Sequence, residues 1–240
     1  MNENRVLVII PTYNEAENLN LLLPRLLELP IKVLIVDDAS IDGSAEIVRE
    51  FGARTGRVDL LERPGKMGLG SAYRDGFARA LAQGFQSIIQ MDADGSHRVE
   101  DLKNMIEFSR IHPDMELVIG SRWTNGGAVQ NWPKRREILS RAANLYSRIA
   151  LGLKVKDNTA GFRIYQAQLL NRMNLARLSS EGYAFQIEMT REAVRVGANI
   201  AEVPILFVER EFGISKMSSK IIREALFKVT KWGISRLVGR

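Results

Sequence analysis

The fold is decided by the stretch Gln90-Met91-Asp92-Ala93-Asp94-Gly95-Ser96-His97, which follows the apolar pair Ile88-Ile89. If residues 87–91 form a buried strand, Asp92 and Asp94 emerge just past its end, where α/β sheets bind ligands. Two carboxylates there can hold a divalent cation against a diphosphate. Asp and Gly are also ordinary turn residues, so a turn without a ligand is the alternative.

Apolar runs alternate with segments of helical periodicity on both sides of this stretch. The first half contains predicted strands at residues 5–10, 32–36, 58–61 and 87–91, and predicted helices at 15–29, 44–51 and 71–83. The second half is less regular, with predicted helices at 100–109, about 134–151, 166–175 and 183–196, strands at 117–121, 160–165 and 199–208, and a glycine-rich loop at 124–130. Alternating strands and helices imply a Rossmann-like α/β fold, in which helices flank a mainly parallel sheet.

The composition is that of an ordinary soluble globular protein, with 45% hydrophobic and 26% charged residues in 240. The absence of cysteine excludes disulfides and thiolate metal sites, and two histidines argue against a His-rich zinc site. The N-terminus lacks the features of a secretion signal, and no apolar segment is long enough to cross a bilayer. We therefore expect a cytoplasmic protein.

The C-terminal segment differs from the rest, and we expect a catalytic domain over 1–215 followed by a basic amphipathic helix over 216–240. Wound as a helix, this segment collects on one side Ile221, Ile222, Ala225, Leu226, Val229, Trp232 and Leu237. The other side is basic, although Phe227 and Ile234 lie among its lysines. This pattern and the net charge of +6 are typical of a peripheral element on an anionic membrane surface. A helix that packs its apolar side on the domain is the alternative.

Polar residues also follow the first two predicted strands. Tyr13 can stack on a base and Glu15 can accept its hydrogen bonds, or Asn14 can cap the next helix with Glu15 as a partner of the helix dipole. Of the adjacent Asp37 and Asp38, one can cap the turn while the other receives hydrogen bonds from a ligand. These groups converge on one crevice that lacks a phosphate-wrapping loop, so a metal must neutralise the diphosphate.

With these motifs the chain resembles the family 2 glycosyltransferases of GT-A fold, and among them the dolichol-phosphate (polyprenol-phosphate) mannose synthases. The resemblance runs from about Val6 to Lys216 and rests on Pro11-Thr12-Tyr13-Asn14-Glu15, Val36-Asp37-Asp38, Gly68-Leu69-Gly70-Ser71-Ala72, Met91-Asp92-Ala93-Asp94, Gly120-Ser121-Arg122, Arg136, Ser140-Arg141, Gly161-Phe162-Arg163, Val208-Glu209-Arg210, Gly213 and Ser215-Lys216. The later elements are specific for the polyprenyl-phosphate branch.

The resemblance implies a role for each matching position. The base and ribose are expected to contact Pro11, Tyr13, Glu15, Val36 and Asp38. The sugar nucleotide is expected to contact Asp92, Ala93 and Asp94, whose carboxylates reach Mg²⁺ or Mn²⁺. The acceptor phosphate is assigned to Arg122, Arg136 and Ser140, while Arg210 and Lys216 close over the donor diphosphate from a mobile loop. The residues expected to act in catalysis are Asp94, Arg122 and Lys216, with Arg122 also touching the donor.

One position departs from the family pattern, because some relatives carry a metal-ligating Gln where this chain has Ser96. Serine is too short for that task, so a water or His97 is the expected substitute.

The expected reaction is an inverting, in-line transfer of mannose from GDP-mannose to a polyprenyl or dolichyl monophosphate at the cytoplasmic membrane face. The alternative keeps this acceptor and takes UDP-glucose or another UDP-sugar as donor. A more remote alternative, a basic nucleic-acid-binding module, does not explain acidic groups at successive strand ends, because these would repel phosphodiesters. We expect no nucleic acid partner, and membrane contact either directly or through a separate membrane protein.

Overall fold

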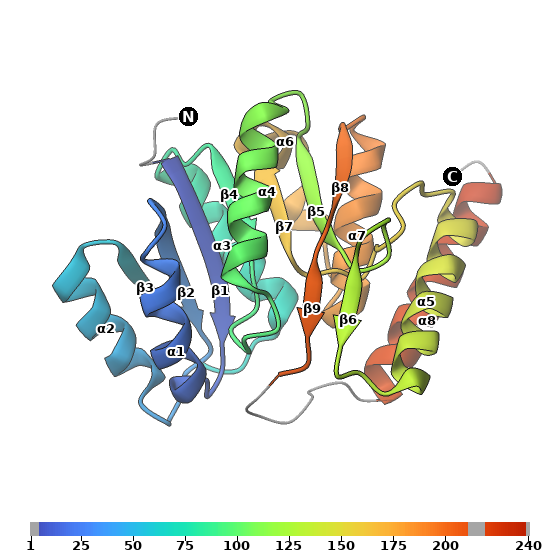
Figure 1. The fold of residues 1–240 in the computed structure, drawn as a ribbon. Helices are drawn as coiled ribbons and strands as arrows, with labels where there is room; N and C mark the ends of the chain where they lie inside the picture. The colour runs from blue at the N-terminus through green and yellow to red at the C-terminus, as the bar shows by residue number, and fades with distance from the viewer. Residues whose placement is uncertain (1–4, 211–218, 239–240) are drawn as a thin grey trace.

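Within residues 5–210 and 219–238, which the computed structural model describes, seven strands form one sheet in the order β3-β2-β1-β4-β7-β5-β8 (Figure 1). The strands are β1 (Val6–Thr12), β2 (Lys32–Asp37), β3 (Val58–Glu62), β4 (Ser87–Gln90), β5 (Leu117–Ser121), β7 (Arg163–Gln166) and β8 (Ile200–Pro204). Neighbouring strands are parallel except where β7 pairs with β4 and β5. The mainly parallel sheet is therefore confirmed, with one antiparallel strand inserted in its middle.

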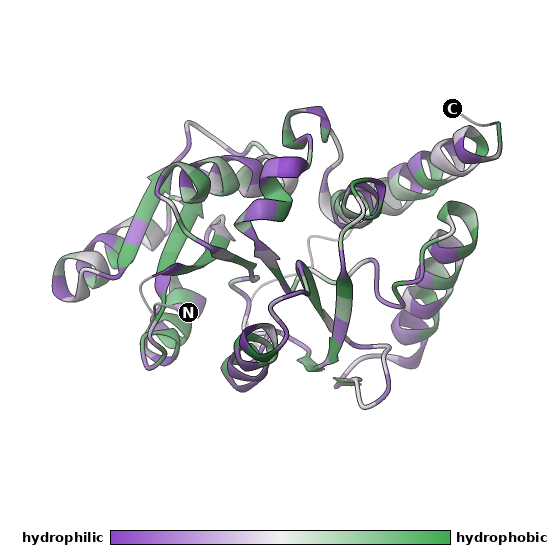
Figure 2. Cartoon of the chain, turned by 90° about the horizontal axis from the view of Figure 1, so that it is seen from above, coloured by the Kyte–Doolittle hydropathy of each residue, from purple (hydrophilic) through white to green (hydrophobic). Residues whose placement is uncertain are grey.

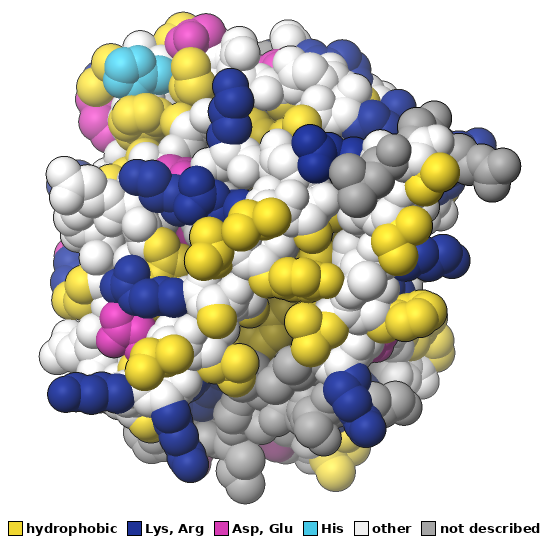
Figure 3. Space-filling view, turned by 90° about the vertical axis from the view of Figure 1, so that its right-hand side faces the viewer, with side chains coloured by type: hydrophobic (Ala, Val, Ile, Leu, Met, Phe, Trp, Pro, Cys, Tyr) yellow, Lys and Arg dark blue, Asp and Glu magenta, His cyan; other side chains and the backbone are white. Residues whose placement is uncertain are grey.

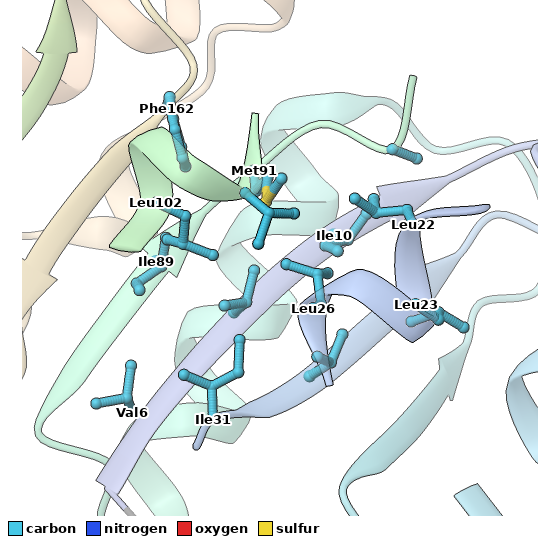
Figure 4. Close-up of a cluster of buried hydrophobic side chains, with 14 of the residues drawn as sticks. Val6, Ile10, Leu22, Leu23, Leu26, Ile31, Ile89, Met91, Leu102 and Phe162 are labelled. Atoms are coloured by element: carbon cyan, nitrogen blue, oxygen red, sulfur yellow. The ribbon is translucent and has the colours of Figure 1, made fainter. Parts of the chain in front are cut away.

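Helices cover both faces of this sheet. One face packs under α1 (Ala16–Leu26), α2 (Ser44–Thr55) and α4 (Val99–Ile111), and the other under α3 (Leu69–Ala82), α6 (Ala167–Arg172) and α7 (Gly182–Arg195). Along β1, Val8 and Ile10 face the first set of helices, while Leu7 and Ile9 face the second, as the strand period of two requires. The strands are mostly hydrophobic and the helices mixed (Figure 2), and Figure 4 shows Ile10 beside Leu22 and Leu26 of α1 in the first core.

Several boundaries differ from the predicted ones. Strand β1 does not stop at Pro11 but continues to Thr12. Pro11 is tolerated because its main chain faces β4, which has already ended at Gln90. Helix α1 ends at Leu26 rather than at residue 29, and α2 extends to Thr55, where Gly56 closes it in the left-handed region at φ 65°.

Two further differences lie in the second half of the chain. The expected strand 199–208 is two strands, β8 and β9 (Leu206–Val208), which belong to different sheets. Strand β9 pairs in parallel with β6 (Ala128–Gln130), a strand within the stretch expected to be a glycine-rich loop. Strand β7 begins at Arg163 rather than at residue 160. The side chain of Arg163 points back along the chain and donates hydrogen bonds to the main-chain carbonyls of Asn158 and Ala160.

The basic helix α5 (Lys134–Leu151) has the predicted bounds and lies beside the C-terminal helix α8 (Ser219–Leu237), which also packs on α7 (Figure 1). Val229 of α8 is buried against Leu151 and Ile187, with Trp232 partly buried alongside. The predicted apolar side of α8 is therefore in part covered by the domain, whereas Leu226 remains 46% exposed. Among the described residues, no helix combines the length and hydropathy that spanning a membrane requires.

Candidate active site

Asp92 and Asp94 follow β4 at the edge where the parallel strands end, as predicted. The Asp94 carboxylate is held at both oxygens: Oδ1 accepts hydrogen bonds from the Ser96 hydroxyl at 2.5 Å and the Ser96 main chain at 3.2 Å. Its Oδ2 forms an ion pair with Arg210 at 3.1 Å. The structure thus brings together Asp94 and Arg210, which lie far apart in the sequence, and gives Ser96 the task of orienting Asp94.

Asp92 is fixed through its main chain and its side chain. Its N–H donates to His97 Nδ1 at 3.1 Å, and the imidazole stacks on Phe162 with ring centroids 4.6 Å apart. The Tyr73 hydroxyl donates to Asp92 Oδ1 at 3.4 Å. Burial raises the pKa of the Asp92 carboxyl; His97 opposes this rise, the charge of Asp94 adds to it, and Arg210 opposes it more weakly.

The chemistry of this pair fits Mg²⁺ or Mn²⁺, which prefer carboxylate and water oxygens. Two adjacent carboxylates that repel each other in a buried loop gain stability from a cation. In the part of the chain that the structure describes, no three His, Cys, Asp or Glu side chains gather as a metal site. Since His97 Nδ1 and the Ser96 hydroxyl are already engaged, the remaining ligands would come from water and the donor diphosphate.

Arg122, predicted to bind phosphate, is buried and already paired. Its Nε and a terminal nitrogen bond the two carboxylate oxygens of Asp157 at 2.7 and 2.6 Å, and the same terminal nitrogen donates to Thr159 at 2.8 Å. Burial alone would lower the pKa of Arg122, but the charge and the hydrogen bonds of Asp157, with smaller contributions from Tyr183 and Asp92, together raise it. The guanidinium carbon of Arg122 also lies 5.5 Å from the ring centroid of Trp132 and 5.4 Å from that of Phe207.

Arg136 connects the arginine side of the site to the carboxylates. It forms an ion pair with Glu209 and lies over the Trp132 ring, 4.0 Å from its centroid. Glu209 neighbours Arg210, whose Nε is 3.9 Å from a Glu209 oxygen and whose other end pairs with Asp94. A continuous series of charges, Asp94–Arg210–Glu209–Arg136, therefore joins the predicted donor and acceptor positions.

The residues expected to contact the base differ in exposure: Pro11, Tyr13 and Glu15 are half-buried, whereas Val36 is buried. Tyr13 is half-buried, with Lys66 over its ring at 4.1 Å, and Glu15 accepts a hydrogen bond from Asn18 at 2.7 Å. Pro11 is also half-buried at this edge of the sheet, but the side chain of Val36 is buried in the core beneath α3, which leaves only its main chain for a ligand. Asn14 does not cap α1, because residue 15 is the N-cap.

Both carboxylate oxygens of Asp38 accept hydrogen bonds from the protein itself, which the sequence did not predict. Its Oδ1 accepts from Arg63 Nε at 2.6 Å, and its Oδ2 accepts from the main chains of Met67 and Gly68 at 3.0 and 3.3 Å. Its neighbour Asp37 closes the turn by accepting from Ser40. Asp37 thus caps the turn as predicted, whereas the bonds to Asp38 come from Arg63 and the loop before α3, and a direct contact to a base stays a prediction.

An apolar pocket of about 290 Å³ lies between α5, α7 and α8, next to the arginines. Its lining includes the polar side chains of Arg136, Ser140 and Thr159, the last of which bonds Arg122, and the rings of Trp132, Tyr146 and Tyr183. Ser140, predicted to bind acceptor phosphate, is thus at the pocket wall near Arg136. Lys216, predicted to act on the donor diphosphate, lies outside the described residues, as does the rest of 211–218.

Four groups of this site were missed from the sequence: Asp157, Glu209 as an ion-pair partner, Arg63 and Tyr73. Arg63 and Tyr73 flank the Gly68–Gly70 stretch, but a buried arginine or tyrosine has no periodic signal of its own. Asp157 was detectable only as a polar residue shortly before the Gly161-Phe162-Arg163 motif. Its contact with Arg122 depends on the insertion of β7 between β4 and β5.

The comparisons with known proteins agree with this geometry. Residues 7–173 match the model of glycosyl transferase family 2. The chain is 46% identical over 233 residues to the polyprenol monophosphomannose synthase of Mycolicibacterium smegmatis, covering 96% of this chain and 87% of that protein. It is 48% identical over 233 residues to the undecaprenyl-phosphate mannosyltransferase of Micrococcus luteus, covering 96% of this chain and 95% of that protein.

Solved structures share the GT-A fold. The glucosyl-3-phosphoglycerate synthase of Mycobacterium tuberculosis, solved with Mn²⁺, UDP-glucose and phosphoglyceric acid, superposes with a TM-score of 0.68 at 14% identity, over 95% of this chain and 79% of that one. The mannosyltransferase PcManGT of Pyrobaculum calidifontis, solved with GDP-Man and Mn²⁺, gives 0.61 at 18% identity, over 98% of this chain and 64% of that one. The chain belongs to glycosyl transferase family 2, with the GT-A fold, and resembles its polyprenol-phosphate mannose synthases.

Proposed function

We propose that this protein transfers mannose from GDP-mannose to a polyprenyl or dolichyl monophosphate. One observation carries the proposal: the series Asp94–Arg210–Glu209–Arg136 joins an acidic pair at the sheet edge to a basic, apolar-lined pocket. Such a site suits a diphosphate donor at one end and an anionic lipid at the other. The names of the two relatives at 46% and 48% identity support the same sugar and acceptor class.

The chain's own residues have clear tasks in this reaction. Arginine matches phosphate oxygens well, so Arg136, with Arg122 behind it, orients the acceptor phosphate next to Ser140. A phosphate monoester has a second pKa of about 6, so its oxygen is a nucleophile near neutral pH and requires no strong general base. Arg210 and Lys216 are assigned to the donor diphosphate. Orientation and charge neutralisation then account for most of the catalysis.

The proposed step is a single in-line displacement with inversion. A phosphate oxygen of the acceptor forms a bond to the anomeric carbon of mannose while the bond from that carbon to the nucleoside diphosphate breaks. The diphosphate leaves with the electron pair of that bond. When bound at Asp92 and Asp94, Mg²⁺ or Mn²⁺ would neutralise the charge of the departing diphosphate.

We further propose that the protein works as a peripheral protein on the cytoplasmic face of a membrane, either directly or through a membrane-protein partner. The outward sides of α5 and α8 carry exposed hydrophobic side chains, among them Ile138, Leu145, Ile149, Phe227 and Ile234. Figure 3 shows hydrophobic side chains gathered over these helices with lysines and arginines around them. An apolar surface with a basic rim is what binding to anionic lipid requires.

The test is a transfer assay with radiolabelled GDP-mannose and polyprenyl phosphate in detergent, with Mg²⁺, Mn²⁺ or EDTA. We expect labelled lipid with either metal and none with EDTA. UDP-glucose in place of GDP-mannose tests the alternative donor. Transfer from UDP-glucose alone would overturn the mannose assignment, and no transfer from either donor would overturn the acceptor assignment.

A further inference from the structure

We propose that Glu181 is a positioning residue for the nucleotide-sugar donor, and that the segment 179–181 connects the donor side of the site to α8. Glu181 directly precedes α7, and its carboxylate lies at the N-terminus of α3. This inference rests on the proposed function, because it takes the strand ends around Asp38 as the donor side. It gives a task to the motif Gly68-Leu69-Gly70-Ser71, which the metal and phosphate assignments leave unused.

The N-terminus of α3 is the kind of position where a helix binds an anion, and the protein places a carboxylate of its own there. Glu181 Oε2 accepts a hydrogen bond from the main chain of Gly70 at 2.6 Å, and Oε1 accepts one from that of Ser71 at 3.3 Å. The N–H groups of a first helical turn and the helix dipole favour negative charge. A donor phosphate would therefore have to displace Glu181 in order to bind these two groups.

Two glycines allow the segment before α7 to approach α3 closely. Gly68 has a φ of +97°, and a Cβ at this position would lie 2.5 Å from Glu181 Oε2. A Cβ at Gly70 would overlap the main-chain oxygen of Ser180. The contact therefore requires glycine at both positions. Glu181 thus holds the first turn of α3 at a defined place.

The turn that Glu181 holds is bonded to Asp38. The main chains of Met67 and Gly68 donate to the Asp38 carboxylate at 3.0 and 3.3 Å. Arg63 bonds the same carboxylate at 2.6 Å and the Gly68 carbonyl at 3.0 Å. Loss of the Glu181 carboxylate would free the first turn of α3 and, with it, groups that orient Asp38. We therefore expect Glu181 to act on donor binding through the loop before α3.

The segment 179–181 is also held from the other side, by α8. Lys228 Nζ donates to the Ser180 hydroxyl at 3.1 Å and to the Ser179 carbonyl at 3.4 Å. The same ammonium group pairs at 3.0 Å with Glu224, one helical turn earlier. Helix α7, which begins after this segment, packs on both α3 and α8. The helix that we expect to contact the membrane is therefore connected to the donor loop.

The test measures the Kd of GDP-mannose, and of UDP-glucose in parallel, by calorimetric titration of the full-length protein with Mn²⁺. Glu181→Ala should raise the donor Kd about 10-fold, as expected for the loss of hydrogen bonds to a charged group. Glu181→Gln, which keeps one acceptor oxygen for Gly70, should raise it about 3-fold. In the transfer assay, kcat at saturating donor and KM for polyprenyl phosphate should stay unchanged, because the effect is confined to the donor side.

Glu192 provides a matched control on the same helix. Its carboxylate also accepts a main-chain N–H, that of Asn174 at 2.9 Å, but near the C-terminal end of α7. Glu192→Ala should leave the donor Kd unchanged, and urea unfolding shows that each variant is folded under the assay conditions. If Glu192→Ala weakens donor binding as much as Glu181→Ala, the effect reflects general stability and the inference is wrong.

Lys228→Met tests the connection to α8. We expect it to raise the donor Kd about 3-fold, with no further rise when it is combined with Glu181→Ala, because both substitutions act through the same segment. Lys231→Met, which removes an exposed lysine from the same helix, should have no effect. Additive effects of Lys228→Met and Glu181→Ala would contradict the connection.

The outcomes separate this inference from the proposed function. If the unmodified protein transfers sugar, but both Glu181 variants bind the donor as tightly as it does, only the inference fails. Tighter binding by Glu181→Ala would also overturn it, because Glu181 would then compete with a donor phosphate. If the unmodified protein binds a donor but transfers nothing to polyprenyl phosphate, the proposed function fails and the donor Kd still decides the inference. If it binds neither donor, both fail.

Discussion

The guanidinium of Arg122 and the carboxylate of Asp157 form a buried, two-pronged ion pair, with Nε–Oδ2 and Nη2–Oδ1 distances of 2.7 and 2.6 Å. Asp157 also accepts the main-chain N–H of Arg122 at 3.0 Å. Both side chains have 5% or less of their surface exposed. Because burying two charges costs much of what their attraction provides, such a pair contributes little to stability by itself. We interpret it as a device that holds a positive charge beside the acceptor position.

Asp157→Asn should therefore destabilise the protein and reduce transfer together. The substitution leaves the Arg122 charge buried without its partner, which typically costs about 3 kcal/mol or more. Urea unfolding measures this loss, and the transfer assay measures activity at a temperature where the variant is still folded. A change in unfolding free energy below about 1 kcal/mol would contradict the view that Asp157 neutralises Arg122.

The double variant Arg122→Met/Asp157→Leu separates stability from function. Replacing both members of a buried pair with apolar side chains is often neutral or stabilising. We expect a smaller loss of stability than in Asp157→Asn, because no charge is left buried and only the main-chain N–H of Arg122 and its polar neighbours lose their acceptor, with transfer lost. Retained transfer would show that Arg122 is dispensable for the acceptor phosphate.

Arg63→Ala should destabilise the protein far more than a comparable surface change. Arg63 is 5% exposed and donates hydrogen bonds to the Asp38 carboxylate, the Ser71 hydroxyl and the Gly68 carbonyl. Its loss therefore leaves the Asp38 carboxylate buried without a positive partner. We expect a loss of about 3 kcal/mol and a higher KM for the donor, because the loop before α3 loosens.

The matched control for Arg63→Ala is Arg25→Ala. Arg25 pairs with Glu100 at 2.9 Å, but both side chains are more than half exposed. A surface pair of this kind is worth less than about 1 kcal/mol. Equal effects of the two substitutions on urea unfolding would contradict the role given to Arg63.

Asp94→Asn should nearly abolish transfer while leaving the fold intact. The amide keeps the shape of the carboxylate but removes the charge that faces Arg210 and the proposed cation. A loss of about 3 kcal/mol of transition-state stabilisation corresponds to about 100-fold in kcat/KM. Transfer rates across a Mn²⁺ titration measure this, and activity within a factor of three of the unmodified protein would refute the metal assignment.

Ser96→Ala should act through Asp94, with a smaller effect. The serine hydroxyl donates to the Asp94 carboxylate at 2.5 Å and fixes its orientation. Loss of a group that orients a metal ligand typically weakens metal binding about 10-fold. We expect the Mn²⁺ concentration for half-maximal transfer to rise by about this factor, with kcat at saturating Mn²⁺ little changed. Ser96→Thr, which keeps the hydroxyl, should restore the original value.

Ile234→Asp should weaken binding to vesicles that contain anionic lipid. Ile234 is 58% exposed on α8, and a carboxylate there adds both polarity and negative charge to the proposed membrane surface. Ile111→Asp is the control, because Ile111 is also 58% exposed but ends α4, away from α5 and α8 (Figure 1). Vesicle flotation compares the two, and equal binding by both variants would argue against this surface.

Much of the fold was predictable because the first half of the chain follows simple rules. Apolar runs such as residues 32–36 and 87–91 alternate with segments of helical period, and these signals require no long-range information. The second half was harder for a physical reason. Strand β7 is antiparallel between two other strands, and β6 and β9 are three residues long, so long-range pairing rather than local pattern defines them.

The candidate site was predictable where it follows strand ends. Asp92 and Asp94 lie where the sequence indicated, and Arg210 forms an ion pair with Asp94, while its role at the donor diphosphate stays a prediction. Partners such as Asp157 and Arg63 were not predictable, because one sequence does not reveal which charges become buried together. Asp38 illustrates the difference: its carboxylate was expected to face a ligand, yet it is bonded to Arg63 and the loop before α3.

The position of β7 inside the sheet limits where residues can be inserted into this chain. Strand β7 is bonded on both sides, and the residues just before it hold Arg122 through Asp157 and Thr159. One extra residue between Asp157 and Arg163 would either displace Asp157 or turn every side chain of the strand to the opposite face. A fluorescent reporter or a circular permutation is better placed at the solvent-exposed tip 113–114, where no such double constraint exists.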